Sequence, residues 1–410
     1  MNNPYRLFVG IDWAKEEHTI CVIDHDQKIV DRRAVPHSGA GMAQLCEVLA
    51  KLSGADPASV AIAIETPRGA VVECLVERGY AVHALNPKQM DRFRDRHTVA
   101  GAKDDRRDAF VLADALRTDR HLFHRVRLDD PLVIRLRELS RAEEEVQCEQ
   151  VRVENQLREL LNRYYPQMLA LCPAVEEAWF WDLLELVPRP GAKMPSRSKL
   201  QHLLNSHRIR RLDAADIRQA LEAPALPLAP GAAAAASEHV LLILPTLRLL
   251  QRQRKELERR IEALLEDMSR EGQFAEHRDV TILRSLPGVG RVVTATMLAE
   301  ASQALAERDY HALRCYGGAA PVTRQSAKRK MIVMRQSCNR RLKNALYHWS
   351  RVSSQCDPRS KQHYAELRAK GHSHGRALRG VVDRLLAMLV AMLESGTTYD
   401  PARRQAGAAR

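Results

Sequence analysis

The N-terminal part of the chain alternates short apolar runs with turns and helical segments, and this pattern limits the fold more than any other feature. Five runs have the length and composition of strands: 6–11, 19–24, 28–35, 59–64 and 81–85. Residues 25–27 predict a turn that joins the second and third strands as a hairpin. Ser38 is placed to cap a helix that runs to Leu52, and 70–78 and 105–117 predict two more helices. A hairpin followed by alternating strands and helices predicts an α/β domain with a mixed sheet.

Four acidic residues fall where such a fold can gather them. Asp12 follows the first strand, Glu65 follows the fourth, and Asp105 and Asp108 lie three residues apart on one helix face. Clustered carboxylates repel one another unless a cation neutralises them, and Mg²⁺ and Mn²⁺ prefer oxygen ligands. Such ions can activate a nucleophile and stabilise the leaving oxygen in phosphodiester displacement. Each acid alone is more often a turn residue or a helix N-terminal acid, so the prediction of a ribonuclease H-like catalytic domain rests on their joint order.

A rival within the same fold class is a sugar-kinase or actin-like ATPase, which also opens with a strand that reads Gly-Ile-Asp. Those proteins need a Gly- or Thr-rich phosphate loop directly after that Asp. Here the following residues, Trp13 to Glu17, contain no glycine, and no Walker-type loop occurs elsewhere. The ATPase reading is therefore disfavoured.

Two later segments carry apolar residues at heptad spacing. The first set is Leu132, Leu139, Val146, Val153 and Leu160, and the second is Leu250, Leu257 and Leu264. Each stripe predicts a long helix that buries one side against another helix. Glu143 and Gln150 interrupt the first stripe, so an antiparallel hairpin within the chain and a seam between two copies remain equal alternatives.

Between these segments the composition changes twice. Residues 196–222 hold a short basic helical patch that includes Arg208, Arg210 and Arg211. Residues 223–236 are rich in Pro and Ala and predict a linker. Pro245 predicts the start of a helix or a kink.

The C-terminal part is strongly basic. The whole chain of 410 residues has a formal net charge of +13, and no Asp or Glu occurs between Ala312 and Gln355. A run of one sign needs a counter-charge, and the phosphate backbone of nucleic acid supplies it. Gly288 and Gly290 lie in a turn of helix-hairpin-helix form, where glycine lets the backbone approach phosphate, although a plain helix–helix turn has the same pattern.

A candidate nucleophile follows in the segment Tyr316–Lys330. Ser326 lies after a Gly/Pro-rich stretch and among basic residues, and a serine needs an activating group and nearby cations to attack a phosphate. On local chemistry alone a loop hydroxyl is its commoner role, and Thr323 is a weaker candidate. The residues predicted to contact nucleic acid are Gly288, Gly290, Arg324, Lys328, Arg329, Lys330, Asn339, Arg340, Arg341 and Lys343.

Seven motifs occur in a specific order: VGIDWAK around Asp12, AIET around Glu65, NPKQ at Asn86, KDDRRDA around Asp105 and Asp108, LPGVG at Leu286, YGGAAPVTRQSAKRK around Ser326, and CNRRLKNALY at Asn339. In this order and spacing the sequence resembles the DEDD-type insertion-sequence transposases. These are bridge-RNA-guided serine recombinases, and the family includes the pilin-gene invertases. Two residues depart from the family pattern: Asp104 stands where Thr is usual, and Ala327 follows the serine where Gly is usual.

The resemblance implies an RuvC-like fold whose Asp12, Glu65, Asp105 and Asp108 bind Mg²⁺ (or Mn²⁺). It implies that Ser326 attacks the DNA phosphate and forms a covalent protein–DNA intermediate, and that an element-encoded structured RNA guides the reaction. It also implies that a coiled coil assembles a homodimer or tetramer, in which carboxylates and serine can meet between subunits.

The expected organisation has three parts: a catalytic domain over 1–125, a helical coiled-coil region over 126–275, and a mainly helical C-terminal DNA-binding domain over 276–400. The expected function is that of a transposase or site-specific recombinase acting on DNA. Two alternatives remain: a Holliday-junction-type nuclease that uses the carboxylates alone, and a non-catalytic nucleic-acid-binding scaffold. The longest apolar run, 240–244, is too short for a membrane span. We therefore expect a bacterial cytoplasmic protein, nucleoid-associated when bound to DNA.

Overall fold

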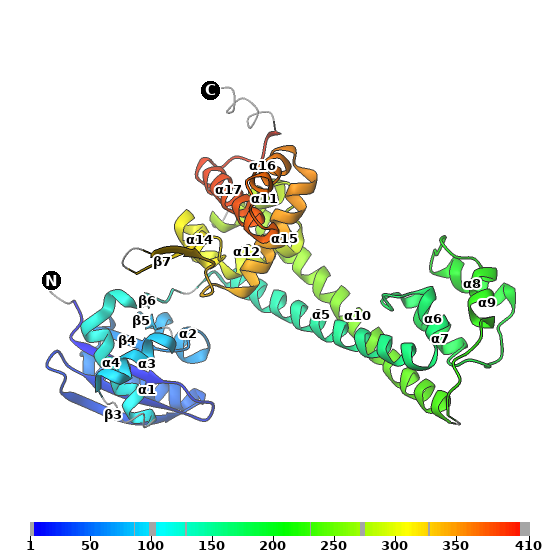
Figure 1. The fold of residues 1–410 in the computed structure, drawn as a ribbon. Coiled ribbons are helices and arrows are strands. Elements are labelled where there is room, and N and C mark those ends of the chain that lie inside the picture. The colour runs from blue at the N-terminus through cyan, green and yellow to red at the C-terminus, as the bar shows by residue number, and fades with distance from the viewer. Residues whose placement is uncertain are drawn as a thin grey trace. The chain divides into compact units, whose positions relative to one another are not determined.

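The computed structural model describes residues 4–85, 87–97, 104–127, 129–229, 231–270, 275–326 and 329–401. The chain divides into two compact units, Met1–Asp129 and Asp130–Arg410 (Figure 1).

The first unit is built on a mixed sheet. Its strands are β1 (Leu7–Asp12), β2 (Glu17–Ile23), β3 (Ile29–Pro36), β4 (Val60–Ile64), β5 (Ala81–Ala84) and β6 (His124–Arg125). Their order in the described sheet is β3-β2-β1-β4-β5-β6. β4 pairs parallel with both β1 and β5, whereas the β1–β2, β2–β3 and β5–β6 pairs are antiparallel. The mixed sheet confirms the predicted α/β class, and only the two-residue β6 was not expected.

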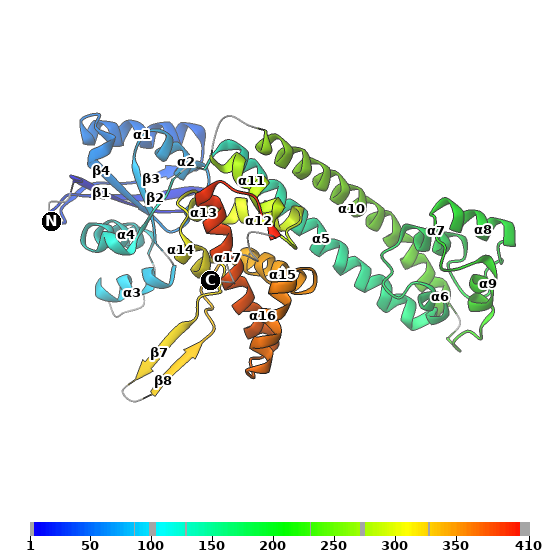
Figure 2. The same cartoon turned by 90° about the horizontal axis from the view of Figure 1, so that it is seen from above.

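Helices cover both faces of this sheet (Figure 2). They are α1 (Gly39–Ser53), α2 (Ala70–Glu77), α3 (Pro87–His97) and α4 (Asp105–Asp119), with short 3₁₀ turns at Pro57–Ser59 and Arg120–Leu122. Val9 and Ile11 of β1 pack in one buried cluster with Leu49 of α1. Phe8, on the opposite face of β1, packs in a second cluster with Leu112 of α4. The alternation of apolar side chains along β1 therefore fills both layers.

The second unit contains two long helices, α5 (Pro131–Tyr164) and α10 (Ala232–Ser269), which lie side by side (Figure 1). Leu136 near the start of α5 shares a buried cluster with Met268 near the end of α10. Leu157 near the end of α5 shares another with Leu244. The two helices therefore run antiparallel within one chain, as one of the two alternatives predicted.

Helix α10 begins earlier than the sequence pattern suggested. Ala232–Ala236, expected to belong to a linker, form its first turns, because alanine has the highest helix propensity and this face packs against the neighbouring cluster. Pro245 lies inside the helix and does not start it. The carbonyl of Leu241, which loses its intrahelical partner to this proline, belongs to an exposed residue, where water can satisfy it.

Four short helices pack around one end of this pair, and we call residues 165–222 the tip. They are α6 (Pro166–Leu171), α7 (Ala178–Leu186), α8 (Arg197–Ser206) and α9 (Ala214–Glu222). The tip has an aromatic core in which Trp179, Phe180 and Trp181 are fully buried.

The C-terminal part packs around the other end of the pair. It contains α11 (Ala275–Ser285), α12 (Arg291–Glu300), α13 (Ser302–Ala306), α14 (Tyr310–Tyr316), β7 (Val322–Ser326), β8 (Arg329–Val333), α15 (Arg340–Cys356), α16 (Pro358–Ala369) and α17 (His374–Ser395). It is mainly helical, as predicted. The β7–β8 hairpin was not expected from the sequence.

In the described part of the chain, α10 is the one helix whose length and apolar composition satisfy a test for a membrane span. A core helix of a soluble protein satisfies the same test, so a single such helix is weak support for a span. Buried residues of α10 such as Leu244 and Leu247 pack in the tip cluster.

Candidate active site

Asp12 and Glu65 extend two neighbouring strands at the same edge of the sheet. Ile11 of β1 is paired with Ile64 of β4 in parallel register, so the residues that follow them lie side by side. Side chains alternate along a strand, and Phe8 and Ala63 both pack in the cluster beneath α4. The alternation therefore turns Asp12 and Glu65 toward the α4 face. Both are half-buried.

A glycine lets α4 approach this face closely. A Cβ atom on Gly10 would lie 1.8 Å from the carbonyl oxygen of Ala109 and 2.7 Å from the amide nitrogen of Ala113. No side chain fits in that space, so β1 and α4 are in backbone contact at this point. Asp108 directly precedes Ala109 and is 2% exposed. The contact therefore places the Asp108 carboxylate over the same face as Asp12.

The Asp108 carboxylate is bound by an arginine of α3. Nε and Nη2 of Arg94 donate to its two oxygens at 2.6 and 2.7 Å, and Nη1 donates to Asp91 at 2.6 Å. The hydrogen bonds to Asp108 raise the pKa of Arg94, and the charges of Asp108, Asp91 and Glu65 add to this. A guanidinium thus supplies the positive charge that buried carboxylates require.

The two remaining acids lie at the start of α4. Asp105 is its first residue and is exposed. Asp104 is the N-cap, and its side chain accepts a hydrogen bond from the Arg106 amide at 3.1 Å. This capping bond accounts for an acid at a position where threonine, also a good capping residue, is usual.

The described residues contain no group of three His, Cys, Asp or Glu side chains close enough to hold a metal ion. The structure brings Asp108 together with Arg94, and it places Asp12 and Glu65 on the facing strand ends. All the candidate donors are carboxylate oxygens, which is the donor set that Mg²⁺ and Mn²⁺ take. The ligand roles of Asp12, Glu65, Asp105 and Asp108 stay predictions.

Arg94→Ala should show that the buried Asp108 carboxylate needs a positive charge beside it. It leaves the buried Asp108 carboxylate unpaired, so we expect a loss of about 3 kcal/mol in the free energy of unfolding when divalent ions are chelated. Added Mn²⁺ should restore part of that loss and should stabilise the variant more than the wild type, because Arg94 no longer competes for Asp108.

Thermal unfolding with EDTA and with a Mn²⁺ series measures both effects. The control is Arg92→Ala, an exposed arginine of the same helix, which should change stability by less than about 0.5 kcal/mol. Equal stabilisation of wild type and Arg94→Ala by Mn²⁺ would mean that Arg94 does not compete with the ion.

Ser326 ends strand β7 and is exposed. It lies opposite Arg329 in the register of the hairpin, and Arg324 is on the same face, two residues earlier. Lys328 lies outside the described residues, as do the side chains of Arg329 and Lys330. The serine predicted to lie in a loop therefore stands at the end of a hairpin strand.

The two glycines of the Leu286–Gly290 turn have different surroundings. Gly288 has a φ of +79°, and a Cβ there would lie 2.9 Å from the Ser353 amide nitrogen. The turn is fastened to α15 through the carbonyl of Pro287, which accepts from Trp349 Nε1 at 3.0 Å and from Ser353 Oγ at 2.7 Å. Gly290 caps α12, and a Cβ there would meet no atom within 4 Å. Gly290 is thus the one of the two that leaves room for a ligand.

Two of the residues predicted to bind nucleic acid belong to a buried ionic cluster. Arg341 Nη1 donates to Glu300 Oε1 at 2.6 Å, and Asn339 Nδ2 donates to Glu300 Oε2 at 2.7 Å. Arg141 of α5 donates to the same carboxylate at 3.1 Å. We call Glu300, Arg141, Asn339 and Arg341 the Glu300 cluster. It joins α5, α12 and α15, and sequence reasoning missed it.

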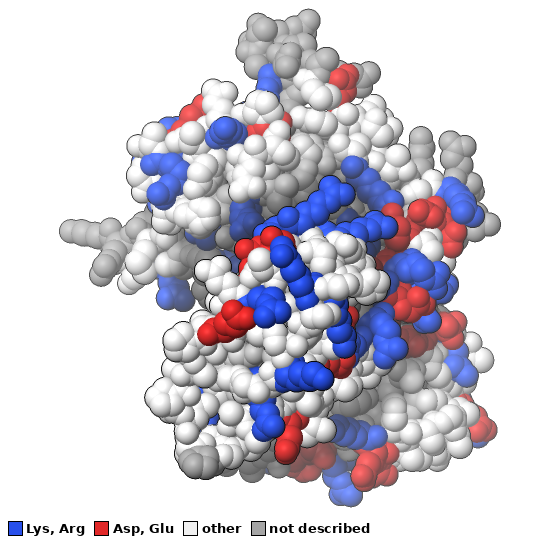
Figure 3. Space-filling view, turned by 90° about the vertical axis from the view of Figure 1, so that its right-hand side faces the viewer, with Lys and Arg blue, Asp and Glu red and all other residues white. Residues whose placement is uncertain are grey.

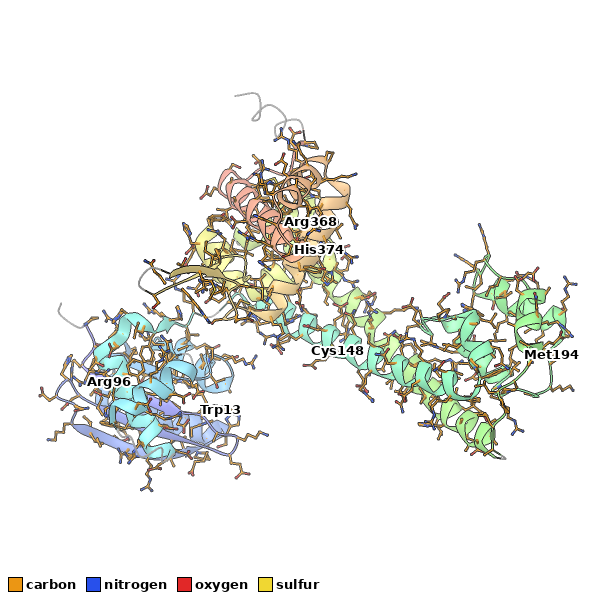
Figure 4. All side chains as sticks on the ribbon, viewed as in Figure 1. Trp13, Arg96, Cys148, Met194, Arg368 and His374 are labelled. Carbon is orange, nitrogen blue, oxygen red and sulfur yellow. The ribbon has the colours of Figure 1, made fainter. Side chains whose placement is uncertain are left out.

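Other residues of α15, which are not part of the Glu300 cluster, form a largely polar face that is exposed to solvent. Its exposed residues follow helical spacing and comprise Arg340, Asn344, Tyr347, His348, Arg351, Val352, Gln355 and Cys356. No acidic residue occurs in the helix. Arg340 belongs to this face, whereas Lys343 is half-buried. The aromatic Tyr347 lies beside His374 of α17, with ring centroids 6.4 Å apart. His374 is labelled in Figure 4.

Comparisons with known proteins cover both regions. Residues 9–166 match the model of the DEDD-type IS110 transposases, described as "Transposase", and residues 280–365 match the "Transposase IS116/IS110/IS902 family". The "Mini-circle putative transposase for IS117" of Streptomyces coelicolor is 30% identical over 97% of this chain and 96% of its own length. The chain belongs to the IS116/IS110/IS902 family of transposases.

Other relatives agree with this assignment. The transposase is 45% identical to the "Putative transposase y4uE" of Sinorhizobium fredii, over 52% of this chain and 60% of that protein. It is 28% identical to the "Insertion element IS110 uncharacterized 43.6 kDa protein" of Streptomyces coelicolor, over 96% of this chain and 95% of that one. The enzyme class is thus that of a DNA transposase, and DNA is its partner.

Proposed function

We propose that the transposase cuts and rejoins the DNA of its insertion sequence with Asp12, Glu65, Asp105 and Asp108 as Mg²⁺ or Mn²⁺ ligands and with Ser326 as the nucleophile. The observation that supports this most is the contact between Gly10 and Ala109. It holds the buried Asp108 over the strand ends of Asp12 and Glu65, and Asp108 already binds a cationic group there.

Each residue has a defined task in this proposal. A divalent ion would lower the charge on the scissile phosphate and stabilise the leaving oxygen. Asp12 and Glu65 would hold the ion from the strand ends, Asp105 would contribute from the start of α4, and Asp108 would contribute when Arg94 does not bind its carboxylate. The freed guanidinium can then bind a phosphate oxygen, for which its planar donors are suited.

The serine step conserves the phosphodiester. Ser326 Oγ forms a bond to phosphorus, and the bond from phosphorus to one deoxyribose oxygen breaks. The serine proton passes to solvent or a base, while the deoxyribose oxygen takes up a proton. The DNA end stays linked to the protein until a hydroxyl of another strand attacks and releases the serine. Arg324, exposed on the same hairpin face, can neutralise the phosphate.

The proposal extends to partners. The acid-free exposed face of α15 suits contact with a phosphate backbone, and the resemblance implies that a structured guide RNA is bound as well as DNA. For assembly into a homodimer or tetramer, α10 offers Leu242 and Leu249, which are seven residues apart and 76% and 47% exposed. Apolar residues at this spacing can bury against a second copy.

A covalent adduct is the decisive product. The wild type, incubated with end-labelled element DNA and Mg²⁺ and then denatured, should give a labelled band at the mass of the protein plus DNA. Ser326→Ala should give none, because no other group then forms the ester bond. Thr323→Ala is the matched control, since Thr323 is exposed on the same strand but faces the other way.

The alternatives predict other results. A nuclease that uses the carboxylates alone would still cut the DNA with Ser326→Ala and would give no adduct with either protein. A non-catalytic scaffold would retain every function with Asp12→Asn, whereas we expect this variant to lose cleavage by at least about a hundredfold.

A further inference from the structure

Apart from its first two residues, the tip lies outside both regions that match the transposase family. The matches cover residues 9–166 and 280–365, and the tip occupies about the first half of the interval between them. It is nevertheless a folded module, since Trp179, Phe180 and Trp181 form its core and Trp181 Nε1 donates to the carbonyl of Val175 at 2.7 Å. The proposed reaction assigns no task to this module.

The surface of the tip carries a segment of one charge sign. Between Glu185 and Asp213 the sequence has seven Arg and Lys residues and no Asp or Glu. All seven are exposed, and Arg211 is paired with Glu177, which leaves six: Arg189, Lys193, Arg197, Lys199, Arg208 and Arg210. We call these six the tip cations. None of them forms an ion pair with a residue of the described chain.

The acids of the tip are already engaged elsewhere. Glu177 is bound by Arg211, whose Nη2 and Nη1 donate at 2.5 and 3.1 Å. Asp182 is bound by Arg248 of α10 at 2.6 Å. Asp213 forms the capping box of α9. Arg197 interacts with Asp213 through its charge, but none of the tip cations forms an ion pair within the described part of the module, and a polyanion would supply the missing counter-charge.

Arg208 adds an independent observation. It has a φ of +57°, just after α8, where the Ile209 amide closes the helix by donating to Leu204 O at 2.9 Å. Glycine adopts this left-handed conformation freely, whereas a side chain costs roughly 1 kcal/mol. A cation stands here at a position where glycine would be more stable.

The tip is also held at a fixed distance from the C-terminal helices by α5. On α5, Glu144 is bound by Arg341 of the C-terminal helices, and Tyr164, which packs in the same buried cluster as the tip helices, lies twenty residues further along. A helix rises 1.5 Å per residue, so the tip lies about 30 Å from that contact, or about nine base pairs of B-DNA.

Figure 3 faces the tip and shows Lys and Arg side chains across the middle of the view.

We propose that the tip cations bind the phosphate backbone of duplex DNA about nine base pairs beyond the segment held by the C-terminal helices. The tip thus lengthens the footprint of the transposase without reading sequence, because its cations contact phosphate and its aromatic side chains are buried. This goes beyond the proposed reaction, which needs only the strand at the scissile phosphate.

The test compares two full-length variants that lose equal charge. The tip variant is Arg197→Gln/Lys199→Gln/Arg208→Gly, in which the glycine also relieves the left-handed residue. The control is Arg152→Gln/Arg259→Gln/Arg260→Gln on the helical hairpin, where each arginine is paired with Glu149 or Glu256. Binding to a fluorescent duplex of about 40 base pairs is measured by anisotropy over a salt series.

We expect the tip variant to bind at least about tenfold more weakly near 0.15 M salt, and its salt slope to fall by about 3, one unit for each lost phosphate contact. The control should keep the wild-type slope. Hydroxyl-radical protection should shorten at one end only in the tip variant. An unchanged slope, or a loss seen with duplex RNA but not with DNA, would overturn the proposal.

A second variant separates a loss of DNA binding from a loss of the folded tip. The tip variant can lose the near-ultraviolet circular dichroism of the buried tryptophans. In that case the salt slope of Lys193→Gln/Arg210→Gln tests the proposal, because both residues lie outside the helices of the tip. Its salt slope should fall by about 2. An unchanged slope in this variant contradicts the proposal as well.

Discussion

Gly10→Val should unfold the catalytic face of the first unit. The new Cβ would lie 1.8 Å from the carbonyl oxygen of Ala109, so the backbone of α4 must move away from β1. Overpacking of a dense core costs about 1–3 kcal/mol, and a clash with backbone belongs at or above the upper end of that range. Asp108 would move with the helix, so cleavage should be lost even at temperatures where the unit stays folded.

Thermal unfolding and hydrogen exchange of the α4 amides measure this change. Gly39→Ala is the matched control, because Gly39 opens α1, and a Cβ there would meet nothing within 4 Å. Alanine should be neutral or stabilise by up to about 1 kcal/mol. Wild-type stability and cleavage in Gly10→Val would mean that α4 does not pack on β1 as described.

Glu300→Ala should weaken the second unit by about 3–5 kcal/mol, because it leaves Arg141 and Arg341 in a buried site without their shared carboxylate. The side chain of Glu300 is only 5% exposed. Denaturant unfolding of the full chain, with the wild type alongside, measures the loss. We also expect weaker DNA binding, since the cluster fixes the start of α15 against α5.

The pH dependence of this effect has a definite sign. Burial raises the pKa of Glu300, but the hydrogen bonds from Arg141 and Asn339 and the charges of Arg141 and Arg341 outweigh it and hold the pKa below its ordinary value of 4.5. The stability that Glu300 contributes is thus fully present above pH 4.5 and is lost as the pH falls through the lower folded value. The difference between wild type and Glu300→Ala should shrink in that acid range.

Glu256 is the control for this experiment. Arg259 and Arg260 lower the pKa of Glu256 to about 2, yet all three side chains lie on the exposed surface of α10. Solvent and salt screen such pairs, so Glu256→Ala should change stability little. Equal effects of Glu256→Ala and Glu300→Ala would contradict a special role for the buried cluster.

The strands and helices of the first unit follow from the sequence because their apolar residues alternate clearly. Helix α3 was missed because Met90 and Phe93 are the only buried side chains among its described residues 89–97. The β7–β8 hairpin was missed because Val322 is half-buried and the rest of β7 is exposed, so no alternation marks it.

The sequence predicts which residues belong to the candidate site, but it does not predict which side chains contact one another there. Asp12 and Glu65 follow strands, and Gly10 inside a strand already indicates a close backbone approach. Arg94 gave no signal, because it pairs with Asp108 across fourteen residues through the packing of α3 on α4. Likewise, Asn339 and Arg341 look like nucleic-acid contacts in sequence, and only the packing of α15 on α12 reveals their carboxylate partner, Glu300.

The central claim is that the carboxylates and the serine act in one transposition reaction. Junction PCR for the excised circle tests it in cells that carry the gene with its native flanking DNA, with wild type, Glu65→Gln and Ser326→Ala compared at equal protein levels. We expect circles in the wild type and none in either variant. Circles in Glu65→Gln would remove the carboxylates from the mechanism, and circles in Ser326→Ala would remove the serine.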